Sequence, residues 1–273
     1  MTFIFTIIFF CFGLIIGSFL NVVIYRLNTA KSLGGRSACM SCMRKLPWYE
    51  LVPVFSFLGL KGRCRGCKTK ISIQYPLVEF ATGLVFAFLF LRLRDIFSST
   101  LFTFSIVYVY YAVIFSILVV IATYDFKHKI IPDVLSLVFG VLAFIGLFFF
   151  RNNDFSGTVG FYLHMPSIWD FLSGILVAFP FAFFWFVSSG KWMGLGDAKL
   201  ALGIGWLLRI AGALSGFVLA FWIGAIVGLS LIICSKFCGS DYNMKSEIPF
   251  APFLVFGTIA VFLFGLNFFP FGF

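Results

Sequence analysis

The stretch Thr-Tyr-Asp-Phe-Lys-His-Lys-Ile-Ile-Pro-Asp, residues 123–133, places Asp125 at the end of a long apolar run. A second stretch, Gly-Leu-Gly-Asp-Ala-Lys at residues 194–199, does the same with Asp197. An ionised carboxylate at membrane depth is costly, so each aspartate predicts a functional site. If the helices bring the two together, they cannot both ionise easily, and one holds a proton while the other is a base. Such a pair can activate water for attack on a peptide bond.

The composition excludes a soluble domain. The 273 residues are 62% hydrophobic and 11% charged, with a mean hydropathy of +1.09. Runs of about 20 apolar residues recur along the chain, and each is long enough to cross a bilayer. The formal charge of +10 could suggest a nucleic-acid partner. The basic residues cluster in loops on one predicted side of the membrane, however, so we expect a lipid bilayer around the chain and no nucleic acid.

The apolar pattern predicts an all-α polytopic protein of about eight transmembrane helices. The first is residues 1–25; it has no Lys or Arg before Arg26 and no cleavage site after it, unlike a cleaved signal peptide. The others lie at roughly 77–93, 101–124, 131–150, 169–188, 198–210, 212–234 and 250–269. We therefore expect a first helix at 1–25, a cytoplasmic loop at 26–76 and a membrane-embedded core at 77–273.

Charge orients these spans. The segment 26–75 carries ten basic residues and a single acid, Glu50, which marks it as cytoplasmic. Six further basic residues fall in the other inside loops and four in the outside loops, so the predicted topology satisfies the positive-inside rule. It places Asp125 and Asp197 on the same, cytoplasmic side of the membrane. The weakest span is 198–210, which reaches only about 20 Å; a single bent element over 198–234 is the alternative.

Four cysteines in the cytoplasmic loop predict a metal site. They form two Cys-x-x-Cys pairs separated by 21 residues: Cys39, Cys42, Cys64 and Cys67. Two such pairs complete a tetrahedron of thiolates, which suits zinc. Disulfides are rare in the cytosol, and a redox thiol pair would not need two matched pairs. Zinc would supply much of the folding energy of so small a loop.

Several stretches in order resemble the prepilin peptidases, the type IV leader peptidase family. They are Gly17-Ser-Phe-Leu-Asn-Val-Val-Ile-Tyr-Arg-Leu27, the double Cys-x-x-Cys, Ile71-Ser-Ile-Gln-Tyr-Pro-Leu-Val-Glu79, the Asp125 segment with Ile131-Pro-Asp133, Gly194-x-Gly-Asp197 with Lys199, and Ile248-Pro-Phe-Ala-Pro-Phe253. The resemblance covers nearly the whole chain, and the usual proline after Tyr-Arg-Leu is replaced by Asn28.

The resemblance implies an intramembrane aspartic peptidase. Its catalytic residues would be Asp125 and Asp197, and it would cut the leader from type IV prepilins or pseudopilins at the cytoplasmic face. The cysteine loop of the bifunctional members implies a second activity, methylation of the new N-terminal residue, usually phenylalanine, from S-adenosylmethionine. No nucleotide-binding signature places the methyl-donor site, and neither the particular pilin nor the oligomeric state follows from the sequence.

The sequence suggests roles for four other polar residues, and for two of them it leaves alternatives. Asp133 follows Pro132 and is expected to start a helix. Lys199 either pairs with a carboxylate or extends to the membrane interface. Glu79 either serves the helix dipole in the first turn of its span or contacts a substrate or cofactor. Asp170 is expected to cap a helix.

Other function classes remain as alternatives. A transporter could use the two aspartates for protons or cations, but no internal repeat is visible and the cysteine loop stays unexplained. A zinc-dependent scaffold would leave both aspartates without a role.

Overall fold

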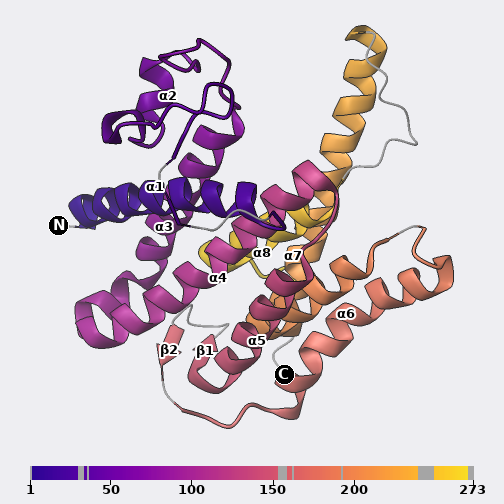
Figure 1. Cartoon of the computed structure of the whole chain (residues 1–273). Helices are drawn as coiled ribbons and strands as arrows, with labels where there is room; N and C mark the ends of the chain where they lie inside the picture. Colours follow the sequence, from indigo (N-terminus) through magenta and orange to yellow (C-terminus); the bar gives the residue numbers. More distant parts are fainter. Residues whose placement is uncertain are drawn as a thin grey trace. The chain divides into compact units, whose positions relative to one another are not determined.

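A computed structural model describes residues 2–29, 34–35, 37–152, 159–161, 163–191, 193–238 and 249–269. These parts of the chain are mostly helical (Figure 1). The elements in order are α1 (Thr2–Arg26), the short 3-10 helix η1 (Trp48–Glu50), α2 (Phe55–Gly59), α3 (Gln74–Ser99), α4 (Leu101–His128), α5 (Asp133–Phe149), β1 (Phe150–Asn152), β2 (Val159–Phe161), α6 (Ile168–Ser188), α7 (Leu195–Cys238) and α8 (Ala251–Phe264).

Five helices in the described ranges are long and apolar enough to cross a membrane: α1, α3, α4, α6 and α7. The apolar helices α5 and α8 are shorter. Helix α7 is broken at Arg209, whose φ of 60° and ψ of −178° are not helical. With that break, the eight expected spans each have a helical counterpart, and the all-α polytopic fold is confirmed. The small antiparallel pair β1–β2 was not predicted from the amino-acid pattern.

The described chain forms two compact units. Unit 1 comprises Met1–Arg94 with Tyr111–Val120, and unit 2 comprises Asp95–Tyr110 with Ile121–Phe273. Helix α4 therefore contributes to both. The cysteine loop belongs to unit 1, whereas Asp125 and Asp197 both belong to unit 2.

In unit 1, glycines bring α1 against α3. A Cβ added to Gly13 would lie 2.7 Å from the Cβ of Phe86, and one added to Gly17 would lie 2.7 Å from the Cα of Glu79. The two backbones approach so closely because no side chain intervenes. The small residues of the first span thus have the packing role expected of them.

Helix α3 begins earlier than the apolar pattern suggested. The Gln74 N–H donates to the Ser72 hydroxyl over 3.2 Å, so the first turn forms before Pro76. Proline is tolerated there because its missing N–H would have had no helical partner. The expectation that Glu79 lies in the first turn is therefore wrong: it lies in the second turn, away from the free N–H groups.

In unit 2, helix α7 packs against α5, α6 and α8. Glycines again permit close contact: a Cβ on Gly203 would lie 2.5 Å from the Phe139 ring, and one on Gly205 would lie 2.7 Å from the Cα of Gly174. Through these contacts α7 is fixed on α5 and α6, and with it Asp197 in its first turn.

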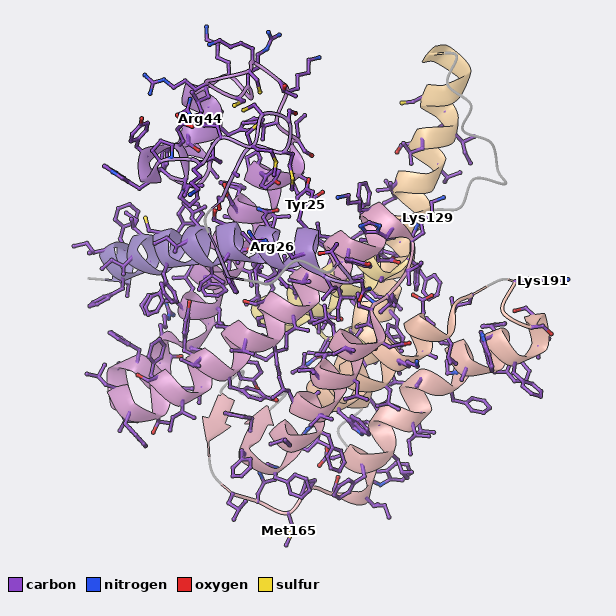
Figure 2. All side chains as sticks on the ribbon, viewed as in Figure 1. Tyr25, Arg26, Arg44, Lys129, Met165 and Lys191 are labelled. Carbon is purple, nitrogen blue, oxygen red and sulfur yellow. The ribbon has the colours of Figure 1, made fainter. Side chains whose placement is uncertain are left out.

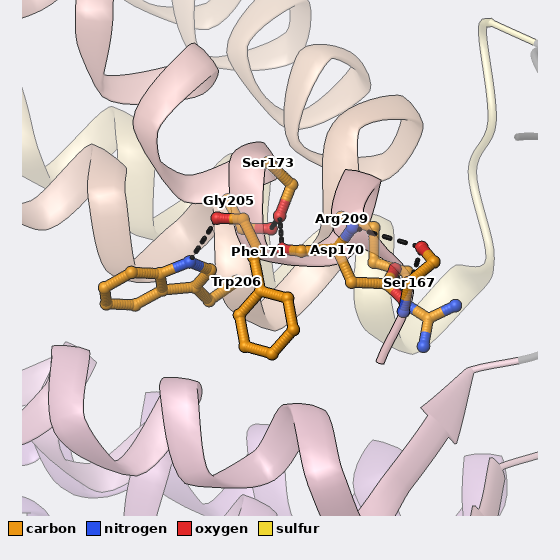
Figure 3. Close-up of polar contacts among 7 residues, drawn as sticks. All are labelled: Ser167, Asp170, Phe171, Ser173, Gly205, Trp206 and Arg209. Carbon is orange, nitrogen blue, oxygen red and sulfur yellow. Dashed lines mark hydrogen bonds and ion pairs between the residues drawn. The ribbon is translucent and has the colours of Figure 1, made fainter. Parts of the chain in front are cut away.

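A polar network fixes the start of α6 against the break in α7 (Figure 3). Ser167 and Asp170 form a reciprocal capping box, so Asp170 has the capping role expected from the sequence. Asp170 also pairs with Arg209 over 3.2 Å. Beside this pair, the Trp206 indole donates to the carbonyl of Phe171 over 3.1 Å and the Ser173 hydroxyl to that of Gly205 over 2.9 Å.

Candidate active site and metal centre

Asp125 is a buried carboxylate in the last turn of α4. Only 5% of the residue is exposed. The C-terminal end of a helix disfavours negative charge, since its unpaired carbonyls point there. The backbone N–H of Ala251, at the start of α8, donates to the Asp125 carboxylate. The positive end of α8 thereby opposes the unfavourable end of α4.

Asp197 lies in the first turn of α7 and is half-buried. Its own N–H donates to the carbonyl of Gly194 over 3.2 Å, and its carboxylate accepts from the backbone N–H of Gly194. The side chain is thus folded back onto the glycine turn that precedes the helix. The N-terminal helix dipole favours a carboxylate at this position.

The structure brings the two aspartates within range of electrostatic interaction, because the charge of Asp125 acts on the Asp197 carboxyl. Two further contacts hold the same segments together. A Cβ on Gly196 would lie 2.9 Å from the Cβ of Ile131, so the turn before α7 packs on the connection after α4. The Lys199 ammonium lies 2.6 Å from Asp133 Oδ1.

The structure decides between the roles that the sequence left open for Lys199 and confirms the role expected of Asp133. Lys199 pairs with a carboxylate, and Asp133 is the first residue of α5. Both side chains are substantially exposed, at 44% and 75% of their surface, so this ion pair contributes little stability. The buried Asp125 and the half-buried Asp197 are in contrast shielded from solvent and interact electrostatically, and two carboxyls so coupled do not ionise together easily.

The hydrogen bond from the Ala251 amide to Asp125 is a feature of the site that could not be predicted from the sequence. The segment Ile248–Phe253 carries no ionisable side chain, so no role could be read from it. Pro252, which favours the first turn of a helix, was the available signal that a helix N-terminus begins there.

The four cysteines of the loop converge. Their sulfur atoms all lie within 4.8 Å of one another, and the sulfurs of Cys39 and Cys67 are 3.7 Å apart. A tetrahedral site with Zn–S bonds of 2.3 Å requires sulfurs about 3.8 Å apart. The cluster could therefore hold a metal ion, with one ligand atom from each cysteine.

Each cysteine pair lies in a similar backbone turn. Cys39 N–H donates to the Arg44 carbonyl and Cys64 N–H to the Thr69 carbonyl, over 3.0 and 2.9 Å. The chain reverses through left-handed residues just after the second cysteine of each pair, at Met43 and Lys68, with φ of 56° and 60°. Isolated bridges Ala38–Lys45 and Arg63–Lys70 close both turns. The repeated geometry presents the four sulfurs to one point.

Hydrogen bonds favour the thiolate at two of the four cysteines, Cys39 and Cys67. The Thr69 hydroxyl lies 3.2 Å from the Cys67 sulfur, and by donating to the thiolate it lowers the pKa of Cys67 to about 6. The backbone N–H groups of Cys42 and Ser41 lower the pKa of Cys39 in the same way. Since a metal binds the thiolate, these donors prepare the site.

An ion pair lies beside the cluster. Arg44, labelled in Figure 2, lies 2.6 Å from Glu50, the single acid of the loop, whose side chain is 3% exposed. Sulfur atoms and nitrogen-tipped side chains gather around Arg44 in that view. The loop thus neutralises its buried carboxylate internally. Among its described basic residues, six are exposed: Lys45, Lys61, Arg63, Arg65, Lys68 and Lys70.

Two family models match the chain. The Bacterial Peptidase A24 N-terminal domain matches residues 11–93, which include the four cysteines, and the Type IV leader peptidase family matches residues 112–229, which include both aspartates. No solved structure gives a significant match.

Relatives are similar over most of their length. A prepilin leader peptidase/N-methyltransferase of Myxococcus xanthus is 36% identical over 90% of this chain and 68% of that protein. Enzymes of the same name from Bacillus subtilis and Vibrio cholerae are 30% and 29% identical, over 94% and 96% of this chain and 94% and 98% of theirs.

Proposed function

The chain belongs to the type IV leader peptidase family, and from this premise we propose that Asp125 and Asp197 are its catalytic dyad. It is a multi-pass membrane enzyme that removes the leader of a type IV prepilin or pseudopilin and methylates the new N-terminus. Nothing in its relatives supports the transporter alternative. The observation that carries the dyad is the electrostatic interaction between a buried and a half-buried carboxyl on two helix ends.

The difference between the two carboxyls suits acid–base chemistry. One carboxylate removes a proton from the attacking water, while the other, protonated, donates a hydrogen bond to the carbonyl of the scissile peptide. The Ala251 N–H holds Asp125 in place through this exchange. The Gly194 turn similarly fixes Asp197. Two carboxyls held in this way need little reorganisation during the reaction.

Topology supports cleavage at the cytoplasmic face of the inner membrane. Sixteen of the twenty Lys and Arg residues fall on one predicted side, together with the loop 26–76 and both aspartates. We accordingly assign the loop to the cytoplasm and the peptidase reaction to the membrane-embedded core, residues 77–273.

The cysteine cluster fits zinc in a structural role. Cys39, Cys42, Cys64 and Cys67 would hold the ion, and because all four positions are filled by thiolates no open position remains for a substrate. For the second activity, S-adenosylmethionine supplies an electrophilic methyl group. The receiving group is the amine released by leader removal.

The dyad is tested with purified enzyme and a prepilin, scoring leader loss by mass. Asp125→Asn and Asp197→Asn each keep size and polarity but cannot exchange the proton, so each should lower cleavage by several orders of magnitude. Methylation of a pre-cleaved pilin should survive in both variants.

Asp133→Asn is the matched control, because it removes an exposed carboxylate from the same region. It should cost at most about 1 kcal/mol of stability and leave cleavage near the wild-type rate. Efficient leader removal by either dyad variant in a folded, zinc-loaded protein would exclude the proposed roles.

A further inference from the structure

Unit 1 contains a buried carboxylate that the peptidase reaction does not use. Glu79 on α3 is 7% exposed. Its carboxylate accepts the Val54 N–H over 2.7 Å and the hydroxyl of Ser18 on α1. Within the described residues no Lys or Arg pairs with it. A buried carboxylate without a counter-charge is costly, so a cation bound from outside would stabilise its charged form.

A second acceptor without a donor lies on the facing helix. Asn21 is 1% exposed, and its side-chain NH₂ donates to the carbonyls of Gly17 and Tyr75, over 3.3 and 3.1 Å. These two bonds fix the orientation of the amide. The Asn21 Oδ1 atom is then buried without any hydrogen-bond donor. Buried acceptors normally accept a hydrogen bond, so we expect a donor to bind at this oxygen as well.

The two acceptors belong to one interface. Ser18, which donates to Glu79, is one helical turn from Asn21, and Tyr75, whose carbonyl accepts from Asn21, is one turn from Glu79. The rings of Tyr25 and Tyr75 stack next to them, with centroids 5.1 Å apart (Tyr25 is labelled in Figure 2). The interface thus combines a negative charge, a free acceptor and aromatic surface.

The residue that covers Glu79 has an unfavourable backbone conformation. Val54 has φ of 60° and ψ of −51°, a region that β-branched side chains rarely adopt. This conformation delivers its N–H to the carboxylate. Strained residues of this kind concentrate at functional sites, and an incoming N–H donor could replace the Val54 amide on Glu79.

We propose that Glu79 and Asn21 form the binding site for the N-terminal ammonium of the cleaved pilin. This inference rests on the methylation part of the proposed function. An ammonium brings three N–H donors and one positive charge, which match the free Asn21 oxygen and the unpaired carboxylate. A sulfonium has no N–H to donate, so these acceptors fit the amine and not the methyl donor.

The same carboxylate prepares the amine for methylation. An ammonium nitrogen has no lone pair and cannot attack a methyl group. Glu79 takes one proton from it, so that R–NH₃⁺ and the carboxylate become R–NH₂ and the carboxylic acid. The proton stays on Glu79, and the nitrogen lone pair is free for methyl transfer.

The test compares wild type with Glu79→Gln, which keeps an oxygen for the Val54 N–H but loses the charge. Binding is measured for a synthetic peptide that begins with a free-amine phenylalanine and for its N-acetylated form. Wild type should prefer the free amine by about tenfold or more, as expected for a charge-assisted hydrogen bond, and the variant should lose that preference. Methylation of a pre-cleaved pilin should fall to a similar extent or further.

Leader cleavage and zinc content should remain within about twofold of wild type, because the dyad and the cysteines are unchanged. Thr82→Val is the matched control: Thr82 is fully buried on the same helix and its hydroxyl bonds the Val78 carbonyl of its own helix. It should retain both the amine preference and methylation. Glu79→Asp, which keeps the charge, should retain part of the preference.

Three results would overturn the inference: an unchanged amine preference in Glu79→Gln, unchanged methylation, or a loss of cleavage and zinc as large as the loss of methylation, which would show a structural role. If wild type methylates nothing, the methylation part of the proposed function fails. The peptide comparison then still decides whether the amine binds at Glu79.

Discussion

At the scale of single residues, backbone amides hold the proposed dyad in place. Asp125 is held by the Ala251 N–H and Asp197 by the Gly194 N–H. Both donors are backbone N–H groups, which every residue except proline has. The residue types therefore identify the two acids but not the groups that donate to them. The two aspartates were candidates from the sequence because an acidic side chain at membrane depth is rare. Their electrostatic interaction depends on helix packing, and their proximity was only an expectation.

Gly196 gives a prediction about this packing. A Cβ at this position would lie 2.9 Å from the Ile131 Cβ, a distance that requires one of the segments to move. Gly196→Ala should therefore displace Asp197 relative to Asp125 and lower leader cleavage about tenfold to a hundredfold, since small misplacements are costly in catalysis. The measurement is kcat/KM for a prepilin.

Gly140→Ala is the control for this change. Gly140 is also a helical glycine of unit 2, but an added Cβ would meet nothing within 4 Å. Its cleavage rate should stay close to that of wild type. Normal kcat/KM in Gly196→Ala would mean that the contact with Ile131 does not position the dyad.

At the scale of elements, the break in helix α7 is a feature that the sequence alone could not establish. Residues 198–210 and 212–234 were expected as two spans, with a single bent element as the alternative. The structure has one helical element broken at Arg209, so both descriptions are partly right. The break adopts a backbone region that only glycine normally occupies. It is held by Asp170, 39 residues earlier in the chain, a pairing that local pattern cannot indicate.

The convergence of the four cysteines was more predictable than the break in α7, because the Cys-x-x-Cys spacing within each pair is a local sequence pattern. Two Cys-x-x-Cys turns specify four ligands, and the structure brings the sulfurs within 4.8 Å. We predict one zinc per chain in the purified protein, measured by elemental analysis. Replacing all four cysteines with serine should remove the metal and unfold the loop, because the binding energy of a structural zinc is folding energy.

Cys11→Ser is the control for this replacement. Cys11 lies exposed on α1 and outside the cluster, so its loss should leave the zinc content unchanged. Zinc that persists after the fourfold replacement would show that the metal binds elsewhere.

At the scale of the whole molecule, the chain divides its chemistry. The proposed dyad lies in unit 2 and in the segment that matches the Type IV leader peptidase family. Glu79, Asn21 and the cysteines lie in unit 1 and in the segment that matches the N-terminal domain. One substrate would then meet the peptidase first and the amine site second, because the amine exists only after cleavage.

This order requires both sites to face the compartment in which the leader lies, which leads to the last prediction. The charge distribution predicts that the loop 26–76 lies in the cytoplasm and the α5–α6 connection on the opposite side. Lys61 and Met165 are exposed residues of these two segments, and Met165 is labelled in Figure 2. An epitope tag inserted after Lys61 should be reached by antibody only in inverted membrane vesicles. A tag after Met165 should be reached only in right-side-out vesicles. Antibody access to Lys61 from the right-side-out surface would reverse the topology, and it would place both aspartates on the side where no cytoplasmic leader could reach them.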